Sequence, residues 1–185
     1  MTIAKTILKA QTSLFPLPVV VVSCASDEHR PNLITLAWAG TLCSIPPVIG
    51  ISINPLRHSH AIVNRSKEFV VNIPSVTQQD IATFCGVESG RKLDKFAHFG
   101  LTAGKAETLK YAPILSEFAV NIECVVVKQV ELGSHTLFLG EIKATQVSDS
   151  VMDKDGTIST RLTDPIAYAG SRYYALGQEY TLRRN

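Results

Sequence analysis

Short runs of β-branched residues, separated by Pro, Gly and Asn, constrain the fold of this chain more than any other feature of its sequence. The five clearest runs are Val19–Cys24, Val48–Ile53, Phe69–Ile73, Phe118–Val127 and Thr136–Ile142. Strands of this length between such breakers are typical of an antiparallel sheet or barrel rather than of alternating strand–helix units. A barrel is favoured, because closure removes the exposed edges that an open sheet leaves.

The run Phe118–Val127 also alternates with a period of two residues. Its apolar side carries Phe118, Val120, Ile122, Cys124 and Val126. Asn121 and Glu123 lie on the opposite side, so this run is expected to be a half-buried strand.

Two helices are expected between the early strands. Ser59 can cap a helix over His60–Lys67. Ser75 and Gln78 have the spacing of a capping box that begins a second helix, and Gly86 fits its C-terminal end.

A third, shorter helix is expected over Leu93–Phe99, ending at Gly100. The chain shows no internal repeat and no linker, and its 185 residues are enough for one domain. We therefore expect a single domain over residues 1–185 that is mainly β with a few helices.

The composition limits the class of protein. Hydrophobic residues make up 45% of the chain and charged residues 18%, which excludes intrinsic disorder. Globular proteins average roughly a quarter charged residues, so the low charge indicates surface buried against a partner subunit or a cofactor. The net charge is only +2, and no cluster of Lys and Arg is longer than Arg183–Arg184, so no nucleic acid is expected as a partner.

The cysteines and the N-terminal segment bear on the compartment. The four cysteines are widely spaced with no CxxC pair, so neither a metal site nor a disulfide framework is expected, and the thiols are expected to be buried. The stretch before Cys24 resembles a lipoprotein cleavage site, but Gln11–Ser13 interrupts its apolar part. No run approaches the ~20 apolar residues of a membrane span. We expect a cytoplasmic protein with no membrane contact.

The common nucleotide and hydrolase motifs are absent from the sequence. There is no GxGxxG after a strand, no GxxxxGK[ST] and no GxSxG. A function must therefore be sought in other polar segments.

The first such segment is Asn32–Gly40, which contains the only tryptophan of the chain, Trp38. Small residues around Trp38 would let the backbone approach a flat ligand, and the indole could cover a ring. Alternatively, Trp38 is a core residue between two strands.

The second segment follows the run Val48–Ile53 and contains Ser52, Arg57 and Ser59. An arginine and a serine at a helix N-terminus can bind a phosphate, because the guanidinium, the hydroxyl and the free helix amides all donate. Alternatively, Ser59 is only a helix cap and Arg57 a solvated side chain.

The third segment is Cys85–Phe96, in which glycines and Ser89 precede Arg91, Lys92 and Lys95. It predicts either a flexible loop rich in hydrogen-bond donors or simply a basic turn on the surface.

These segments together resemble the flavin reductase-like family of FMN-binding split barrels, in particular its flavoredoxin-type members. The matching segments are, in order, Phe15–Val22, Arg30–Gly40, Cys43–Pro47, Arg57–Ser59, Phe69–Ser75, Ser89–Phe96, Gly133–Glu141 and Tyr173–Gly177. Each is short, but their order and spacing cover almost the whole chain.

The resemblance implies a six-stranded antiparallel Greek-key split β-barrel, a homodimer, and one FMN per subunit near the dimer interface. Carried over by position, the residues that would line the flavin ring and ribityl chain are Asn32, Thr35, Ala37, Trp38 and Ala39. Those that would serve the phosphate end are Ser52, Arg57 and Ser59, with Ser89 and Lys95 closing the site. The family often has an acidic residue where Lys92 stands, which leaves open whether Lys92 or Lys95 is the phosphate cation.

The function implied by this resemblance is FMN-dependent electron transfer. In one form the protein is an NAD(P)H-dependent flavin or ferric reductase, with NADH or NADPH as a transient co-substrate. In the other it is a non-enzymatic FMN carrier that only a protein partner reduces. His135 is the candidate for a catalytic side chain near the flavin, although a histidine at the start of a strand can also be structural.

Overall fold

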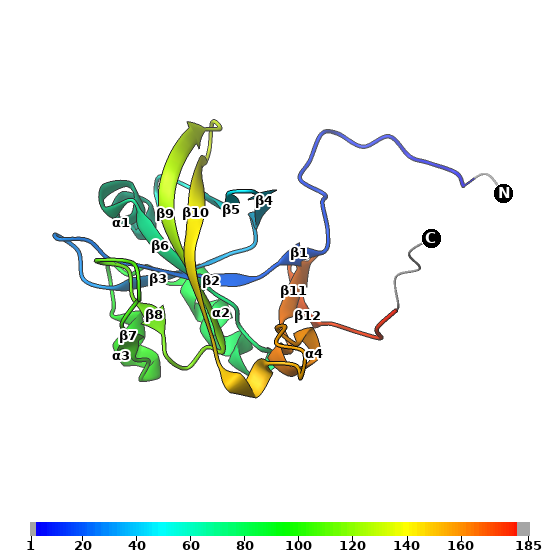
Figure 1. The fold of residues 1–185 in the computed structure, drawn as a ribbon. Helices are drawn as coiled ribbons and strands as arrows, with labels where there is room; N and C mark the ends of the chain where they lie inside the picture. Colours follow the sequence, from blue (N-terminus) through cyan, green and yellow to red (C-terminus); the bar gives the residue numbers. More distant parts are fainter. Residues whose placement is uncertain (1–2, 181–185) are drawn as a thin grey trace.

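The computed structural model describes residues 3–180 of the chain. Its main sheet contains seven antiparallel strands (Figure 1). In spatial order they are β3 (Asn32–Leu36), β2 (Val20–Cys24), β6 (Glu68–Asn72), β9 (Val120–Glu131), β10 (Thr136–Val147), β5 (Pro47–Ile53) and β4 (Ala39–Ser44). The mainly β class and the split-barrel fold are confirmed, but the main sheet has one strand more than the predicted six.

All five β-branched runs form strands of this sheet, namely β2, β5, β6, β9 and β10. The other two strands, β3 and β4, come from the polar segment around Trp38 and the residues that follow it. β4 consists mostly of small and polar residues, whereas β3 contains Leu33, Ile34 and Leu36 and was missed because its segment was interpreted as a polar link between strands.

The sheet curls because β3 and β4 lie at its opposite edges although they are consecutive in the chain. Only Ala37 and Trp38 join them. The backbone N–H of Ser52 donates to the Trp38 carbonyl (2.9 Å), which ties this link to β5. The short link therefore brings the two edges of the sheet together.

Two small sheets accompany the main one. The first contains β1 (Leu17–Pro18), β11 (Ile166–Ala169) and β12 (Arg172–Ala175), and it lies to one side of the main sheet in Figure 1. The second pairs β7 (Ala103–Gly104) with β8 (Ile114–Leu115).

The core has two parts, and β2 contributes to both. Val20, Val22 and Cys24 point into the curled sheet, towards buried residues such as Phe69 and Phe138. The alternate residues Val19 and Val21 pack on the other side, against the helices. Because both faces of β2 are buried, its sequence is continuously apolar instead of alternating.

One glycine in the long strand pair β9–β10 is required by this core. A Cβ added at Gly140 would lie 2.4 Å from Cζ of Phe69. Gly140 therefore leaves room for an aromatic ring that is itself fully buried.

The first helix, α1 (His58–Ser66), corrects one prediction. Its N-cap is Arg57, not Ser59, and Ser59 lies inside the first turn with 1% of its surface exposed. Ser59 is thus not a cap, whereas the side chain of Arg57 is exposed, as the alternative interpretation expected.

The second helical segment begins as predicted and ends later. The capping box of Ser75 and Gln78 is present on the 3-10 turn η1 (Val76–Gln78), which leads into α2 (Gln79–Val87). Gly86 lies within α2, so its prediction as the end of the helix is wrong.

The third helix, α3 (Lys95–Phe99), is shorter than predicted. The Asp94 side chain caps it by accepting from Ala97 N–H (3.1 Å), and Gly100 ends it in the left-handed conformation. A 3-10 turn, η2 (Asp149–Val151), and a short helix, α4 (Thr160–Thr163), follow β10. No helix within residues 3–180 is long and apolar enough to cross a membrane.

The prediction of buried thiols holds for three cysteines and fails for one. Cys24, Cys85 and Cys124 are buried, whereas Cys43 is exposed on β4. Burial raises the pKa of the Cys24 and Cys124 thiols to about 12 and that of Cys85 to about 11.

The polar side of β9 is buried, which corrects the expectation of a half-buried strand. Asn121 is 4% exposed and Glu123 is fully buried. Asn121 Nδ2 donates to Asn72 Oδ1 (2.8 Å) and to the Leu115 carbonyl (3.0 Å). The segment around β7 and β8 covers this side of the sheet, and polar contacts hold it there.

Glu123 accepts four hydrogen bonds, three from this covering segment and one from Gln146 on β10. Its carboxylate accepts from the backbone of Glu107 (2.9 Å) and Thr108 (2.8 Å), from Thr108 Oγ1 (2.6 Å) and from Gln146 Nε2 (2.8 Å). Burial alone would raise the pKa of Glu123, but these hydrogen bonds outweigh it and lower the pKa.

We predict that Glu123→Gln lowers the free energy of unfolding at neutral pH by about 1.5–3 kcal/mol, the worth of a hydrogen bond to a charged group. Since folding lowers the pKa of Glu123, its contribution is fully present above the unfolded value of about 4.3 and is lost as the pH falls through the folded value. Urea unfolding measured from about pH 7 to pH 3 should therefore show that the free energy of unfolding falls less with decreasing pH in the variant than in wild type.

Glu107→Gln is the matched control, because the Glu107 side chain is exposed and makes no hydrogen bond within residues 3–180. If both variants have the same pH profile, Glu123 does not anchor the segment.

Candidate functional site

Three adjoining cavities follow β3, and together we call them the β3 trough. The inner cavity has a volume of about 130 Å³, the middle cavity about 280 Å³ and the outer cavity about 590 Å³. Ile34 and Arg57 line both the inner and the middle cavity. Thr35 and Gly86 line both the middle and the outer cavity, so the three are continuous along one strand.

The inner cavity is built around a buried lysine. Lys95 is 3% exposed, and its Nζ donates to the carbonyls of Leu33 (2.7 Å) and Cys85 (2.9 Å). An ammonium has three N–H groups, so one remains without a partner among the described residues. Burial lowers the pKa of Lys95. A buried cation with a spare donor is suited to an anionic ligand.

Asn32 and Ser59 complete the wall of the inner cavity. Asn32 Nδ2 donates to Ser59 Oγ (2.8 Å), which fixes both side chains beside the first turn of α1. The loop after α2 covers them, and its Gly90 backbone lies against the Asn32 side chain. A Cβ added at Gly90 would overlap Asn32 Oδ1. The glycine thus allows an approach that no other residue would permit.

The rim of the inner cavity carries several cationic groups and one carboxylate, that of Glu88. Burial lowers the pKa of His58, and the nearby His29, Arg91, Arg30 and Lys95 lower it further. Together with the free amides of the first turn of α1, these groups make the inner cavity favourable for an anion.

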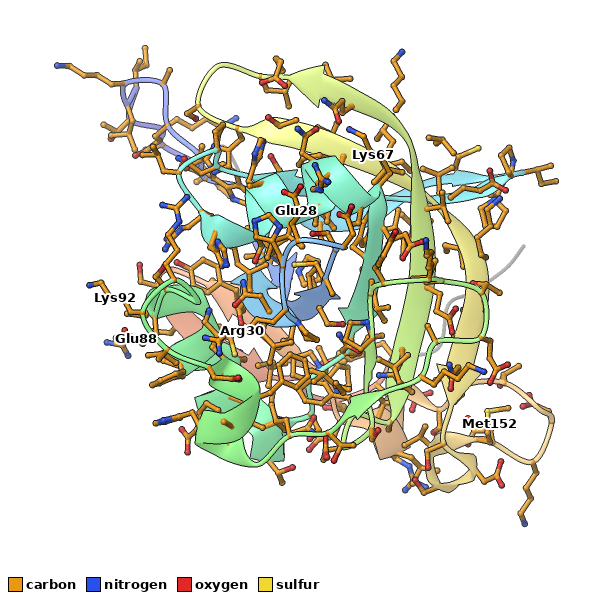
Figure 2. All side chains as sticks on the ribbon, turned by 90° about the vertical axis from the view of Figure 1, so that its left-hand side faces the viewer. Glu28, Arg30, Lys67, Glu88, Lys92 and Met152 are labelled. Carbon is orange, nitrogen blue, oxygen red and sulfur yellow. The ribbon has the colours of Figure 1, made fainter. Side chains whose placement is uncertain are left out.

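The two candidate lysines lie in different places. Lys92 is exposed, lines none of the three cavities and points away from the body of the molecule (Figure 2). Ser89 and Lys95 both line the inner cavity. Of the two lysines, only Lys95 is placed to meet a ligand in the trough.

The middle cavity brings together most of the other predicted residues. Thr35, Ala37, Trp38, Ser52 and His135 all line it. The structure does not place Ala39 there, because it lies on β4, packs against the core and lines a separate apolar cavity.

Trp38 is a wall of this cavity and not a core residue, so the alternative interpretation of the tryptophan is wrong. It is 44% exposed, and its ring centroid lies 4.6 Å from that of His135 at an interplanar angle of 51°. His135 Nδ1 in turn lies 2.9 Å from Ser134 Oγ.

Thr35 carries the clearest sign of a missing ligand. Its Oγ1 is buried and has no hydrogen-bond partner within the described part of the chain. Buried hydroxyls nearly always have a partner, because an unpaired one costs about 1–3 kcal/mol. Thr35 faces the middle and outer cavities, where a bound ligand could supply that partner.

The trough therefore fits FMN in its chemistry. The inner cavity offers an ammonium, hydroxyls and helix amides to a phosphate, and the middle cavity offers an indole, an imidazole and an unpaired hydroxyl to a flat polar ring. No cluster of His, Cys, Asp and Glu that could hold a metal ion occurs between residues 3 and 180.

Several lining residues were not predicted from the sequence. His58 and Gly90 line the inner cavity, Gly86 and Tyr168 the middle one. Gly86 and Gly90 could have been suspected from their place in a predicted loop, but Tyr168 lies on the short strand β11, whose sequence carries no site signal.

Comparisons with known proteins identify the family of this chain. Residues 12–177 match the family model described as flavin reductase like domain, and the chain belongs to this family. It is similar to the flavoredoxin of Desulfovibrio vulgaris (Miyazaki F), with a TM-score of 0.90 and 34% identity over 97% of both chains.

Two further relatives are informative. The flavoredoxin of Methanosarcina acetivorans has a TM-score of 0.87 and 26% identity over 97% of this chain and 95% of its own. A protein of Acinetobacter baylyi named FMN reductase (NADH) is 28% identical over 58% of this chain and 56% of its own. The resemblance to the flavin reductase-like family is therefore confirmed.

We predict that Trp38→Ala costs only about 1–2 kcal/mol of stability, because the side chain is half-exposed. Phe138→Ala, at a fully buried aromatic residue, should cost about 3–5 kcal/mol. Thermal or urea unfolding of the flavin-free proteins measures both. If the two variants lose the same amount of stability, Trp38 is a core residue after all.

Proposed function

We propose that this chain is a cytoplasmic FMN flavoprotein that works as an NAD(P)H-dependent flavin or ferric reductase. The observation that carries the proposal is the β3 trough, which is cationic and rich in donors at one end and aromatic at the other. The unpartnered Thr35 Oγ1 between these ends supports an occupied trough.

In this proposal the inner cavity holds the FMN phosphate. Lys95 supplies a buried positive charge, Ser59 a hydroxyl and Arg57 a guanidinium from the junction with the middle cavity. Charge-assisted hydrogen bonds to a phosphate are about twice as strong as neutral ones. The phosphate end would therefore provide much of the affinity.

The middle cavity would hold the flavin ring. FMN would supply the hydride and electron chemistry, while the protein binds and orients it and excludes water. Thr35 Oγ1 would bond to the ring system, Trp38 would cover part of it, and His135 would lie beside it. The relative named as an NADH-dependent FMN reductase supports a nicotinamide as the electron donor.

A second candidate function is an FMN electron carrier that only a protein partner reduces. The two flavoredoxins among the similar structures favour this alternative. The two functions differ in one step, the direct transfer of hydride from NADH or NADPH.

A homodimer is also part of the proposal. The N-terminal segment extends away from the body of the molecule (Figure 1), and Ile7, Leu14 and Phe15 in it are at least 68% exposed. Unpaired apolar surface of this kind indicates a partner, and a second copy is the one we propose. Sedimentation at micromolar concentration should give about twice the 20.1 kDa of one chain.

We predict that Lys95→Met weakens FMN binding by about 1.5–3 kcal/mol, because it removes a charged donor from the phosphate. Lys92→Met is the matched control and should leave the affinity unchanged. Riboflavin, which lacks the phosphate, should bind wild type and Lys95→Met equally well. If riboflavin loses as much affinity as FMN, then Lys95 only shapes the cavity.

The function itself is tested by mixing the FMN-loaded protein with NADH or NADPH under anaerobic conditions. Rapid bleaching of the flavin absorbance is expected for the reductase. Bleaching that requires a reduced protein partner would support the carrier instead. A protein that stays colourless after incubation with FMN would reject both functions.

A further inference from the structure

The outer cavity is not needed for the phosphate and the ring, and its lining differs from that of the rest of the trough. It is the largest of the three cavities. One wall is the face of α2 with Thr83 and Gly86, and the opposite wall is the hairpin of β11 and β12 with Tyr168, Arg172 and Tyr173. It opens into the middle cavity beside Thr35.

The hairpin has a strained turn at this cavity. Ala169 pairs with Arg172, so Gly170 and Ser171 alone form the turn, with φ angles of +54° and +63°. Glycine adopts such angles freely, but a serine is strained there. Ser171 lines the cavity, and so does Arg172, the first residue after the turn.

Arg172 is the one cationic side chain that lines the outer cavity among the described residues. Its guanidinium takes part in no hydrogen bond or ion pair found within residues 3–180, where the arginines of the ion pairs are Arg30 and Arg65. No carboxylate lines this cavity within the same residues. The charge of Arg172 is therefore available to a ligand.

Two aromatic rings stand beside this charge. The centroids of Tyr168 and Tyr173 lie 6.1 Å apart with an interplanar angle of 64°. Burial raises the pKa of the Tyr173 hydroxyl. With Gly86 and Thr35 on the other side, the space suits a flat ring in contact with tyrosine.

We propose that the outer cavity is a binding site for a planar carboxylate, aromatic or conjugated, next to the flavin site. Its carboxylate would pair with the Arg172 guanidinium, whose fork matches two carboxylate oxygens. Its ring would pack against Tyr168 and Tyr173. A single cation favours a monoanion over a phosphate or diphosphate.

The position of this ligand next to a flavin rests on the function proposed above, but the binding site itself does not. The outer cavity lies beyond Thr35 as seen from Trp38 and His135, which line only the middle cavity. A ligand there would reach the ring from the side that the phosphate does not occupy.

Benzoate is the probe, and benzamide is its neutral counterpart of the same shape. Calorimetry on the FMN-loaded and the flavin-free protein measures both affinities, and the flavin absorbance reports contact with the ring. Benzoate is expected to bind at least ten-fold more tightly than benzamide and to perturb the flavin spectrum. Arg172→Gln should remove this preference and leave FMN affinity unchanged.

Arg161→Gln is the matched control, since Arg161 is an exposed arginine of α4 that lines none of the three cavities. The proposal is overturned if wild type does not bind benzoate, if the two arginine variants behave alike, or if benzoate competes with FMN. Failure of the proposed function has a different signature, in which the wild-type chain does not bind FMN while benzoate binding to the flavin-free protein still depends on Arg172.

Discussion

The rest of the structure depends on a short covalent link between the two edges of one sheet. β3 and β4 are outermost strands, yet only Ala37 and Trp38 separate them. A flat seven-stranded sheet could not satisfy this link, because neighbouring strands lie about 4.8 Å apart. The sheet must curl, and the curl places Trp38 at the seam. The trough follows β3, which α1, α2 and α3 all contact.

The buried polar side chains are of two kinds: some complete all their hydrogen bonds within the protein, and others do not. Asn121 and Glu123 are buried with all their contacts inside the protein, and they hold the segment that covers β9. Lys95 and Thr35 differ, because each retains hydrogen-bonding capacity that the described chain does not use. Both face the trough. The incomplete polar groups therefore coincide with the cavities, as expected where a ligand completes the structure.

Much of the fold could be predicted from local patterns, whereas the site depended on contacts distant in sequence. The run Val19–Cys24 identifies its strand by composition alone, since burial on both faces leaves a continuous apolar sequence. Ser59 was assigned to a cap because the sequence does not show that Asn32, 27 positions earlier, bonds to it. The same limit left Lys92 and Lys95 indistinguishable, since only tertiary packing buries one of them. Arg172 was missed altogether, because an isolated arginine after a turn has no local signal.

The central claim is that FMN lies along β3 with its phosphate at Lys95 and its ring at Trp38. The most direct test is an X-ray structure of this chain crystallised with FMN. The account predicts phosphate density in the inner cavity, within hydrogen-bond distance of Lys95 Nζ, and the flavin ring in the middle cavity beside Thr35. FMN bound outside the β3 trough, or bound with its phosphate beside Trp38, would contradict it.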